Sequence, residues 1–125
     1  AIENHRGNIF EKADTILEAL SDRSQYIGAN VDTGHFATAG LDPVEETKKL
    51  AGRIYHVHFK DSDQHKDLGT GTVDLKSVLK ELKSQHFDGL LSIEHYEYQG
   101  IDDETLKKGL IHSLSYVKEL IKEVY

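Results

Sequence analysis

The sequence contains no cysteine, and basic side chains are fewer than acidic ones. Without cysteine, neither a disulfide nor a thiolate metal site is possible. The formal net charge of −7 argues against a nucleic-acid partner, because nucleic-acid surfaces are normally basic. No apolar run approaches the roughly 18 residues of a membrane-spanning helix, and the opening residues do not resemble a signal peptide. We therefore expect a soluble protein of cytoplasmic origin that does not enter a membrane.

Strand-like and helix-like segments alternate along the 125 residues, which we interpret as a single domain covering 1–125. The chain opens on an apolar residue other than Met, so we expect a fragment or a processed product. The expected strands are 1–4, 26–32, 53–61 and 90–96, and a loop is expected at 33–41. Helices are expected around 10–20, from Asp42 to Gly52, from Asp74 onward and from about 102 to 124. The apolar face of the last helix is expected to consist of Leu106, Leu110, Leu114, Val117 and Ile121.

This β-α-β-α-β-α-β-α order predicts an α/β fold with parallel strands and right-handed crossovers. Four strand–helix units correspond to half of an eight-unit (β/α)8 barrel. A small open sheet is the alternative, but it would leave both of its edge strands bare.

The strand at 53–61 alternates most clearly. Val57 and Phe59 share one face, whereas His56 and His58 share the other, because strand side chains alternate with period 2. His58 lies near the carboxyl end, where α/β folds bind ligands. His56 lies one layer deeper, and we expect it to be a hydrogen-bonded core residue.

A polar residue stands at the carboxyl end of each expected strand. Since these ends lie side by side in a parallel sheet, we expect the four side chains to converge on one point. Three carboxylates and an imidazole suit a divalent metal ion, namely Mn²⁺, Mg²⁺ or Co²⁺, with Zn²⁺ also possible. Singly, each carboxylate is more often a solvated loop residue or a helix cap. The four residues are Glu3, Asp32, His58 and Glu94.

Five motifs are similar to those of the xylose-isomerase-like TIM barrels, in the same order along the chain. This group includes sugar-phosphate isomerases and epimerases, inosose dehydratase and the apurinic endonuclease IV family. The resemblance is to the carboxyl-terminal half of the barrel, strands five to eight. The motifs are Ile-Glu-Asn-His (2–5), Val-Asp-Thr-Gly-His (31–35), His-Val-His-Phe-Lys-Asp (56–61), Leu-Gly-Thr-Gly-Thr-Val-Asp (68–74) and Phe-Asp-Gly-Leu-Leu-Ser-Ile-Glu (87–94).

The resemblance implies that Glu3, Asp32, His58 and Glu94 are metal ligands and that Glu3 and Glu94 also act as acid and base. The implied activity is isomerisation or epimerisation of a small sugar or keto-sugar, or of its phosphate. A divalent cation would stabilise the enediolate while the two carboxylates move the proton. The alternatives are a sugar or polyol dehydratase, a zinc apurinic endonuclease and an inactive half-barrel.

Further residues are candidates for contacting the substrate or a second metal ion. In the resembling family, the histidine that matches His35 contacts the substrate or, in the endonucleases, a further metal ion. His5 would point inward past the strand end, and Lys60 is either a partner for a substrate oxyanion or phosphate or a solvated lysine. Asp63 and His65 resemble zinc ligands of the endonucleases, although a solvated polar loop is equally expected there.

The glycine pair in the segment 69–71 is a weak signal for phosphate binding, and a turn before the Asp74 helix cap is the better interpretation. Since the resemblance covers only half of a barrel, the expected partner is the missing amino-terminal half or a second copy of the chain. A small sugar is the expected ligand.

Overall fold

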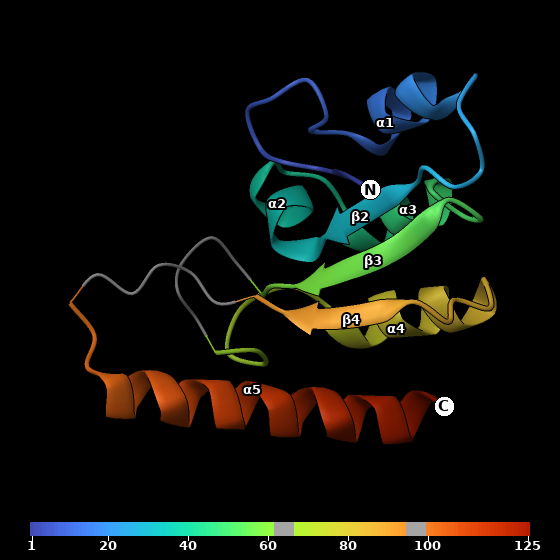
Figure 1. The fold of residues 1–125 in the computed structure, drawn as a ribbon. Helices are drawn as coiled ribbons and strands as arrows, with labels where there is room; N and C mark the ends of the chain where they lie inside the picture. The colour runs from blue at the N-terminus through green and yellow to red at the C-terminus, as the bar shows by residue number, and fades with distance from the viewer. Residues whose placement is uncertain (62–66, 95–99) are drawn as a thin grey trace.

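The computed structural model describes residues 1–61, 67–94 and 100–125 (Figure 1). Its four strands form one parallel sheet whose order, β1-β2-β3-β4, follows the sequence. This arrangement confirms the predicted α/β architecture. The elements are β1 (Ile2–Glu3), α1 (Ala13–Leu20), β2 (Ala29–Asp32), α2 (Thr33–Thr38), α3 (Pro43–Lys49), β3 (Ile54–Phe59), α4 (Leu75–Ser84), β4 (Leu90–Ile93) and α5 (Asp103–Val124).

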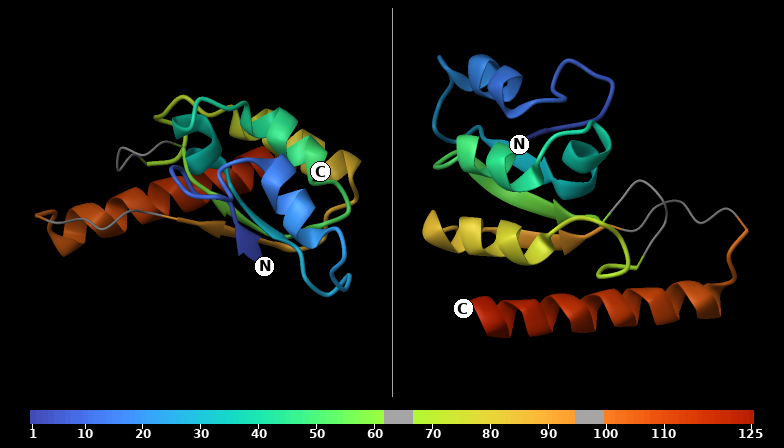
Figure 2. Two further views of the ribbon diagram at one scale, coloured as in Figure 1. Left: turned by 90° about the horizontal axis from the view of Figure 1, so that it is seen from above. Right: turned by 180° about the vertical axis from the view of Figure 1, so that it is seen from behind.

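The helices α1 to α4 lie on one side of the sheet, and α5 packs beside α4 (Figures 1 and 2). None of the helices in the described part of the chain has both the length and the apolar character that a membrane crossing requires. The core between the two layers is built from fully buried side chains of both: Ile16, Val31, Phe36, Val57, Phe59, Leu75, Val78, Leu79 and Leu82.

The strand register brings the polar strand ends to one edge of the sheet. Asp32, the last residue of β2, pairs with His58 of β3, which in turn pairs with Ser92 of β4. Glu3 is the last residue of β1. Glu94 follows β4 directly, and its backbone N–H donates to the carbonyl oxygen of Phe59 at 3.1 Å. The carboxyl ends of all four strands therefore carry the residues singled out from the sequence.

Aspartates begin three of the helices at the expected places. Asp42, Asp74 and Asp102 each accept a hydrogen bond from a backbone N–H in the first turn of α3, α4 and α5, at 2.8, 2.9 and 2.9 Å. These bonds satisfy donors that a helix start otherwise leaves without a partner.

Two segments differ from the sequence-based expectation. The segment 33–41 was expected to be a loop, but its first part is the helix α2, because Asp32 caps it by accepting the His35 N–H at 2.7 Å. The expected strand 26–32 begins only at Ala29. The preceding residues form a turn in which Ile27 N–H donates to the Ser24 carbonyl at 3.0 Å. For the expected strand at 90–96, the structure gives Leu90–Ile93, and 95–99 lie outside the described residues.

The expected apolar face of α5 is wrong at Leu110 and Leu114, which are exposed, whereas Leu106 is half-buried. Small residues are buried there instead, because the loop before α4 lies against the helix. Leu68 N–H donates to Ser113 Oγ at 2.9 Å, and a Cβ on Gly109 would lie 2.3 Å from the carboxylate of Asp67. Such close approach of a loop requires a residue without a side chain. In the second half Val117 is buried and Ile121 is half-buried, as expected.

Candidate metal centre

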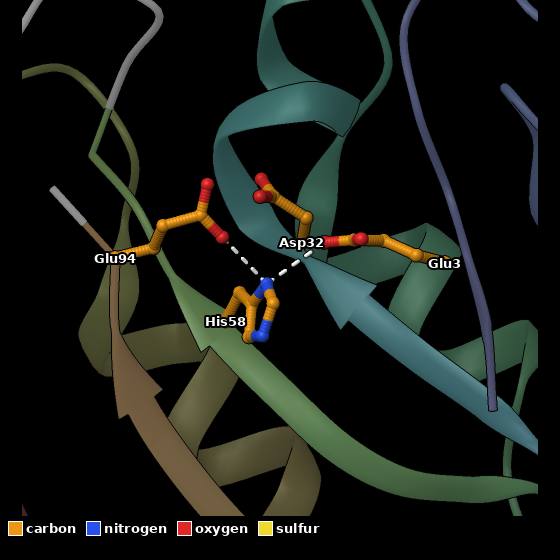
Figure 3. A group of neighbouring side chains, drawn as sticks. All are labelled: Glu3, Asp32, His58 and Glu94. Carbon is orange, nitrogen blue, oxygen red and sulfur yellow. Dashed lines mark ion pairs between the residues drawn. The ribbon is translucent and has the colours of Figure 1, made fainter. Parts of the chain in front are cut away.

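The four residues at the strand ends form one cluster (Figure 3). One potential ligand atom from each of Glu3, Asp32, His58 and Glu94 can be chosen so that all four atoms lie within 4.8 Å of one another. The convergence predicted from the sequence is therefore confirmed. Their role as ligands remains a prediction.

His58 lies between the two glutamates. Its Nδ1 atom is 2.8 Å from Glu3 Oε1 and 2.6 Å from Glu94 Oε2. The amide nitrogen of Asn30 lies 3.3 Å from the other ring nitrogen. As expected, His56 is hydrogen-bonded one layer deeper, with Nε2 2.7 Å from Ser92 Oγ. Burial, followed by the nearby His58, lowers the pKa of His56.

Asp32 is held from two directions and is fully buried. Its backbone N–H donates to Asn4 Oδ1 at 2.7 Å, and the Asn4 amide donates back to the Asp32 carbonyl at 2.9 Å. Its own Oδ1 accepts from His35 N–H as the cap of α2. Sequence reasoning did not assign this role to Asn4, although the residue belongs to the motif at 2–5. The sequence signal for this role is an amide directly after a candidate ligand; the structure shows that this amide is buried, where it requires hydrogen-bond partners.

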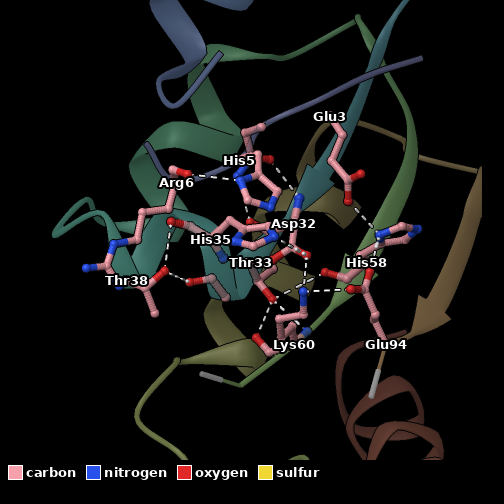
Figure 4. A network of polar contacts seen from close by, with 12 residues as sticks. Glu3, His5, Arg6, Asp32, Thr33, His35, Thr38, His58, Lys60 and Glu94 are labelled. Carbon is pink, nitrogen blue, oxygen red and sulfur yellow. Dashed lines mark hydrogen bonds and ion pairs between the residues drawn. The ribbon is translucent and has the colours of Figure 1, made fainter. Parts of the chain in front are cut away.

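Lys60 joins two members of the cluster (Figure 4). Its Nζ lies 2.9 Å from Asp32 Oδ2 and 2.7 Å from Glu94 Oε1, and its side chain is only 2% exposed, so the alternative of a solvated lysine is wrong. Burial alone would lower the pKa of Lys60, but the two carboxylates outweigh this and raise it. Burial alone would raise the pKa of Glu94, but Lys60 outweighs this and holds it below its ordinary value. Both groups are therefore charged at neutral pH.

Two further histidines lie beside Asp32 (Figure 4). The rings of His5 and His35 are in contact, with centroids 3.9 Å apart and planes tilted by 40°, and His35 Nε2 lies 3.8 Å from Asp32 Oδ2. His35 is buried, whereas His5 is exposed, with Nδ1 2.9 Å from the Arg6 carbonyl. The other two candidates, Asp63 and His65, lie outside the described residues.

The glycine-containing segment 69–71 forms a turn around a carboxylate of the chain itself. The N–H groups of Gly69, Gly71 and Val73 donate to the buried Asp61 carboxylate at 2.8, 2.9 and 2.8 Å. These three donors already have an anionic partner, which agrees with the interpretation of this segment as a turn before Asp74.

The donor set of the cluster fits a divalent metal ion. Carboxylate oxygens and an imidazole nitrogen are ordinary ligands of Mn²⁺, Mg²⁺, Co²⁺ and Zn²⁺. Ligand atoms at about 2.1 Å on opposite sides of such an ion are about 4.2 Å apart, so the observed separations require only small side-chain movements. Three carboxylates this close together also call for positive charge.

The fold and the cluster define an α/β half-barrel with a carboxylate–histidine site at the carboxyl ends of its strands. The family model for the xylose isomerase-like TIM barrel matches residues 1–120, and the chain belongs to that family. This result confirms the resemblance found in the sequence motifs.

Some relatives match most of this chain, but the chain covers less than half of each of them. An uncharacterized protein of Methanocaldococcus jannaschii is 33% identical over 96% of this chain and 43% of its own length. The inosose dehydratase of Clostridium botulinum is 29% identical over 87% of this chain and 42% of its own length. Among solved structures, a D-tagatose 3-epimerase-like protein superimposes with a TM-score of 0.80 at 28% identity, covering 98% of this chain and 46% of the other.

Proposed function

We propose that this chain is the metal-binding half of a divalent-metal-dependent isomerase or epimerase acting on a small sugar or keto-sugar, or on its phosphate. The observation that carries the proposal is the convergence of Glu3, Asp32, His58 and Glu94 at one edge of the sheet. The similarity to a D-tagatose 3-epimerase-like protein supports the substrate class.

The geometry suits proton transfer next to a carbonyl group. A divalent ion, when bound, polarises the carbonyl and stabilises negative charge on its oxygen. Glu3 and Glu94 reach His58 Nδ1 from two sides (Figure 3). One carboxylate takes the proton as the C–H bond breaks and the electron pair moves to the carbonyl oxygen. The other, as the acid, returns a proton to the opposite face of the same carbon. Epimerisation is the result when the original carbonyl re-forms. Protonation of the former carbonyl carbon, with the hydroxyl proton of the first carbon passing to the former carbonyl oxygen, gives an isomer with the carbonyl on the first carbon instead.

The nearby histidines are proposed substrate contacts. His35 is buried beside Asp32, and the ring of the exposed His5 contacts that of His35, so the pair borders the cluster on one side. Imidazole nitrogens can donate to and accept from sugar hydroxyls. For Asp63 and His65, contact with the substrate or a second metal ion stays a prediction.

A dehydratase is the second candidate, because the inosose dehydratase of Clostridium botulinum is among the similar proteins. The first step would be the same proton removal. The acid would then protonate a hydroxyl group on the adjacent carbon, which leaves as water and gives an unsaturated ketone.

The remaining walls of the substrate pocket must come from outside these four units. Leu90 on the edge strand β4 is 74% exposed, and β1 at the other edge pairs only with β2 in the described sheet. We propose that another half-barrel or a second copy of the chain covers these edges. Size-exclusion chromatography with light scattering of the 125-residue chain tests the two-copy form. A stable 14.1 kDa monomer would contradict it.

Metal content and product analysis together test the function. The full chain is purified as wild type, Glu94→Gln and His58→Ala, with Glu119→Gln and His112→Ala as exposed controls. We expect about one divalent ion per chain in the wild type and in both controls, and loss of the ion in the two site variants. Keto-sugars incubated in D2O with the metal-loaded chain, in the assembly that covers its sheet edges, should then gain deuterium at the carbon next to the carbonyl group, whereas a dehydratase would give an unsaturated product.

Each outcome has a distinct meaning. Two or three zinc ions per chain would favour phosphodiester chemistry of the endonuclease kind. Absence of bound metal in the wild type, even after incubation with Mn²⁺, Mg²⁺, Co²⁺ or Zn²⁺, would refute the proposed centre.

A further inference from the structure

Three consecutive residues at the start of α2 lie against Lys60, of which Figure 4 shows Asp32 and Thr33. Asp32 Oδ2 accepts from its Nζ at 2.9 Å. Thr33 Oγ1 accepts from the Lys60 N–H at 3.0 Å and donates to the Lys60 carbonyl at 2.6 Å. Gly34 leaves room for the aliphatic part, since a Cβ there would lie 2.6 Å from Lys60 Cγ. Asp32 thus binds the ammonium of this lysine, Thr33 binds its backbone, and Gly34 leaves space for its aliphatic part.

The Lys60 ammonium lies inside the carboxylate cluster. It joins Asp32 to Glu94, and both the lysine and Asp32 are almost completely shielded from water. Apart from His58, the cluster contains three carboxylates and one ammonium, whose charges sum to −2. A divalent cation balances this charge completely.

We propose that Lys60 is the resident counter-ion of the cluster. In the metal-free chain its ammonium prevents Asp32 and Glu94 from repelling each other and holds them where a metal ion needs them. A divalent ion then binds by taking carboxylate oxygens that the ammonium holds. The proposal rests on the proposed function, because it assumes that the cluster is a metal site.

Removal of the Lys60 ammonium should therefore have opposite effects on the metal-free and the metal-bound chain. Without metal, loss of the ammonium leaves the buried Asp32 carboxylate without this cation and destabilises the fold. With metal, the ammonium is a like charge close to the ion, so its loss strengthens metal binding. A lysine with a merely structural role would give the first effect only, and its removal would weaken metal binding by disordering the ligands.

Lys60→Met in the full chain tests both effects, and Lys49→Met is a matched control. Lys49 also bridges two carboxylates, Asp14 and Glu46, but it is 42% exposed and lies on α3. In EDTA we expect the melting temperature of Lys60→Met to fall by about 5 °C or more. That of Lys49→Met should change by less than about 2 °C.

Isothermal titration with Mn²⁺ gives the second readout. We expect Lys60→Met to bind Mn²⁺ about tenfold more tightly than the wild type, and Lys49→Met to bind as the wild type does. Gly34→Ala is a second variant that keeps every charge but displaces the aliphatic part of Lys60. It should lower the melting temperature in EDTA, although alanine is otherwise the better helix residue.

The possible failures are distinguishable. If the wild type binds Mn²⁺ but Lys60→Met binds it equally or more weakly, or melts like the wild type in EDTA, the counter-ion proposal is overturned and the metal site stands. If the wild type binds no Mn²⁺, the proposed function is wrong, and so is the proposal that a divalent ion takes the carboxylate oxygens held by the Lys60 ammonium.

Discussion

Two lysines of this chain each bridge two carboxylates, in very different surroundings. Lys49 on α3 joins Asp14 at 3.2 Å and Glu46 at 2.7 Å, where the lysine is 42% exposed and Asp14 is 67% exposed. Lys60 joins Asp32 at 2.9 Å and Glu94 at 2.7 Å, where the lysine is 2% exposed and Asp32 is fully buried. The pairing distances are similar, so the difference between the two bridges is their access to water.

Access to water determines what each bridge contributes. An exposed pair contributes about 0–1 kcal/mol, because water stabilises each charge nearly as well as its partner does. In a buried pair each charge depends on its partner, and removing one partner costs about 3–5 kcal/mol. The second acid of the Lys49 bridge, Glu46, is itself buried, but its other oxygen accepts the Ala13 N–H at 2.7 Å at the start of α1, so it has a partner besides Lys49. The Lys60 bridge is therefore the one on which the fold depends.

Removing one acidic partner of each lysine should give the largest difference in stability between the two bridges. Asp32→Ala should lower the free energy of unfolding by about 3–5 kcal/mol, because it removes a buried partner of Lys60 and the cap of α2. Asp14→Ala should lower it by less than about 1 kcal/mol. Urea denaturation of the full chain in EDTA measures both. Similar losses of unfolding free energy in the two variants would show that burial does not make the Lys60 bridge more important for stability than the Lys49 bridge.

The arrangement of the strand ends was predictable because it follows from periodicity and topology. Alternation within β3 put His56 and His58 on one face, and the parallel order brought Glu3, Asp32 and Glu94 to the same edge. Neither step requires knowledge of side-chain packing. The same reasoning located the aspartate caps of α3 and α4, since a cap depends on residues close in sequence.

Features that depend on packing between distant residues were not predictable. Lys60 follows a strand directly, where a charged residue is usually solvated, and its burial depends on the room left by Gly34. In α5, the apolar spacing favoured Leu110 and Leu114 as the packed face, but the loop that carries Leu68 lies against Ser113 instead. The helix α2 depends on Asp32 acting both as a candidate ligand and as a cap, and a ligand role alone does not predict a helix after it.

A smaller effect separates the capping role of Asp32 from its burial. Asp74 caps α4 by accepting the Ser77 N–H at 2.9 Å, much as Asp32 caps α2, but it is exposed and outside the cluster. Asp74→Ala should therefore cost only what a cap contributes, about 1 kcal/mol. A loss as large as that of Asp32→Ala would mean that capping, and not the buried ion pair, explains both.

The pH dependence of the Asp74 cap provides an internal check. Hydrogen bonds from the Ser77 side chain and N–H lower the pKa of Asp74 below its ordinary value of 3.8. A carboxylate whose pKa is lower in the folded state stabilises the fold above its unfolded-state pKa, and this stabilisation is lost as the pH falls through the folded-state pKa. Urea denaturation at pH 7 and pH 3 should therefore show a smaller difference between wild type and Asp74→Ala at pH 3. An equal difference at both pH values would show that the charge of Asp74 does not contribute to its cap.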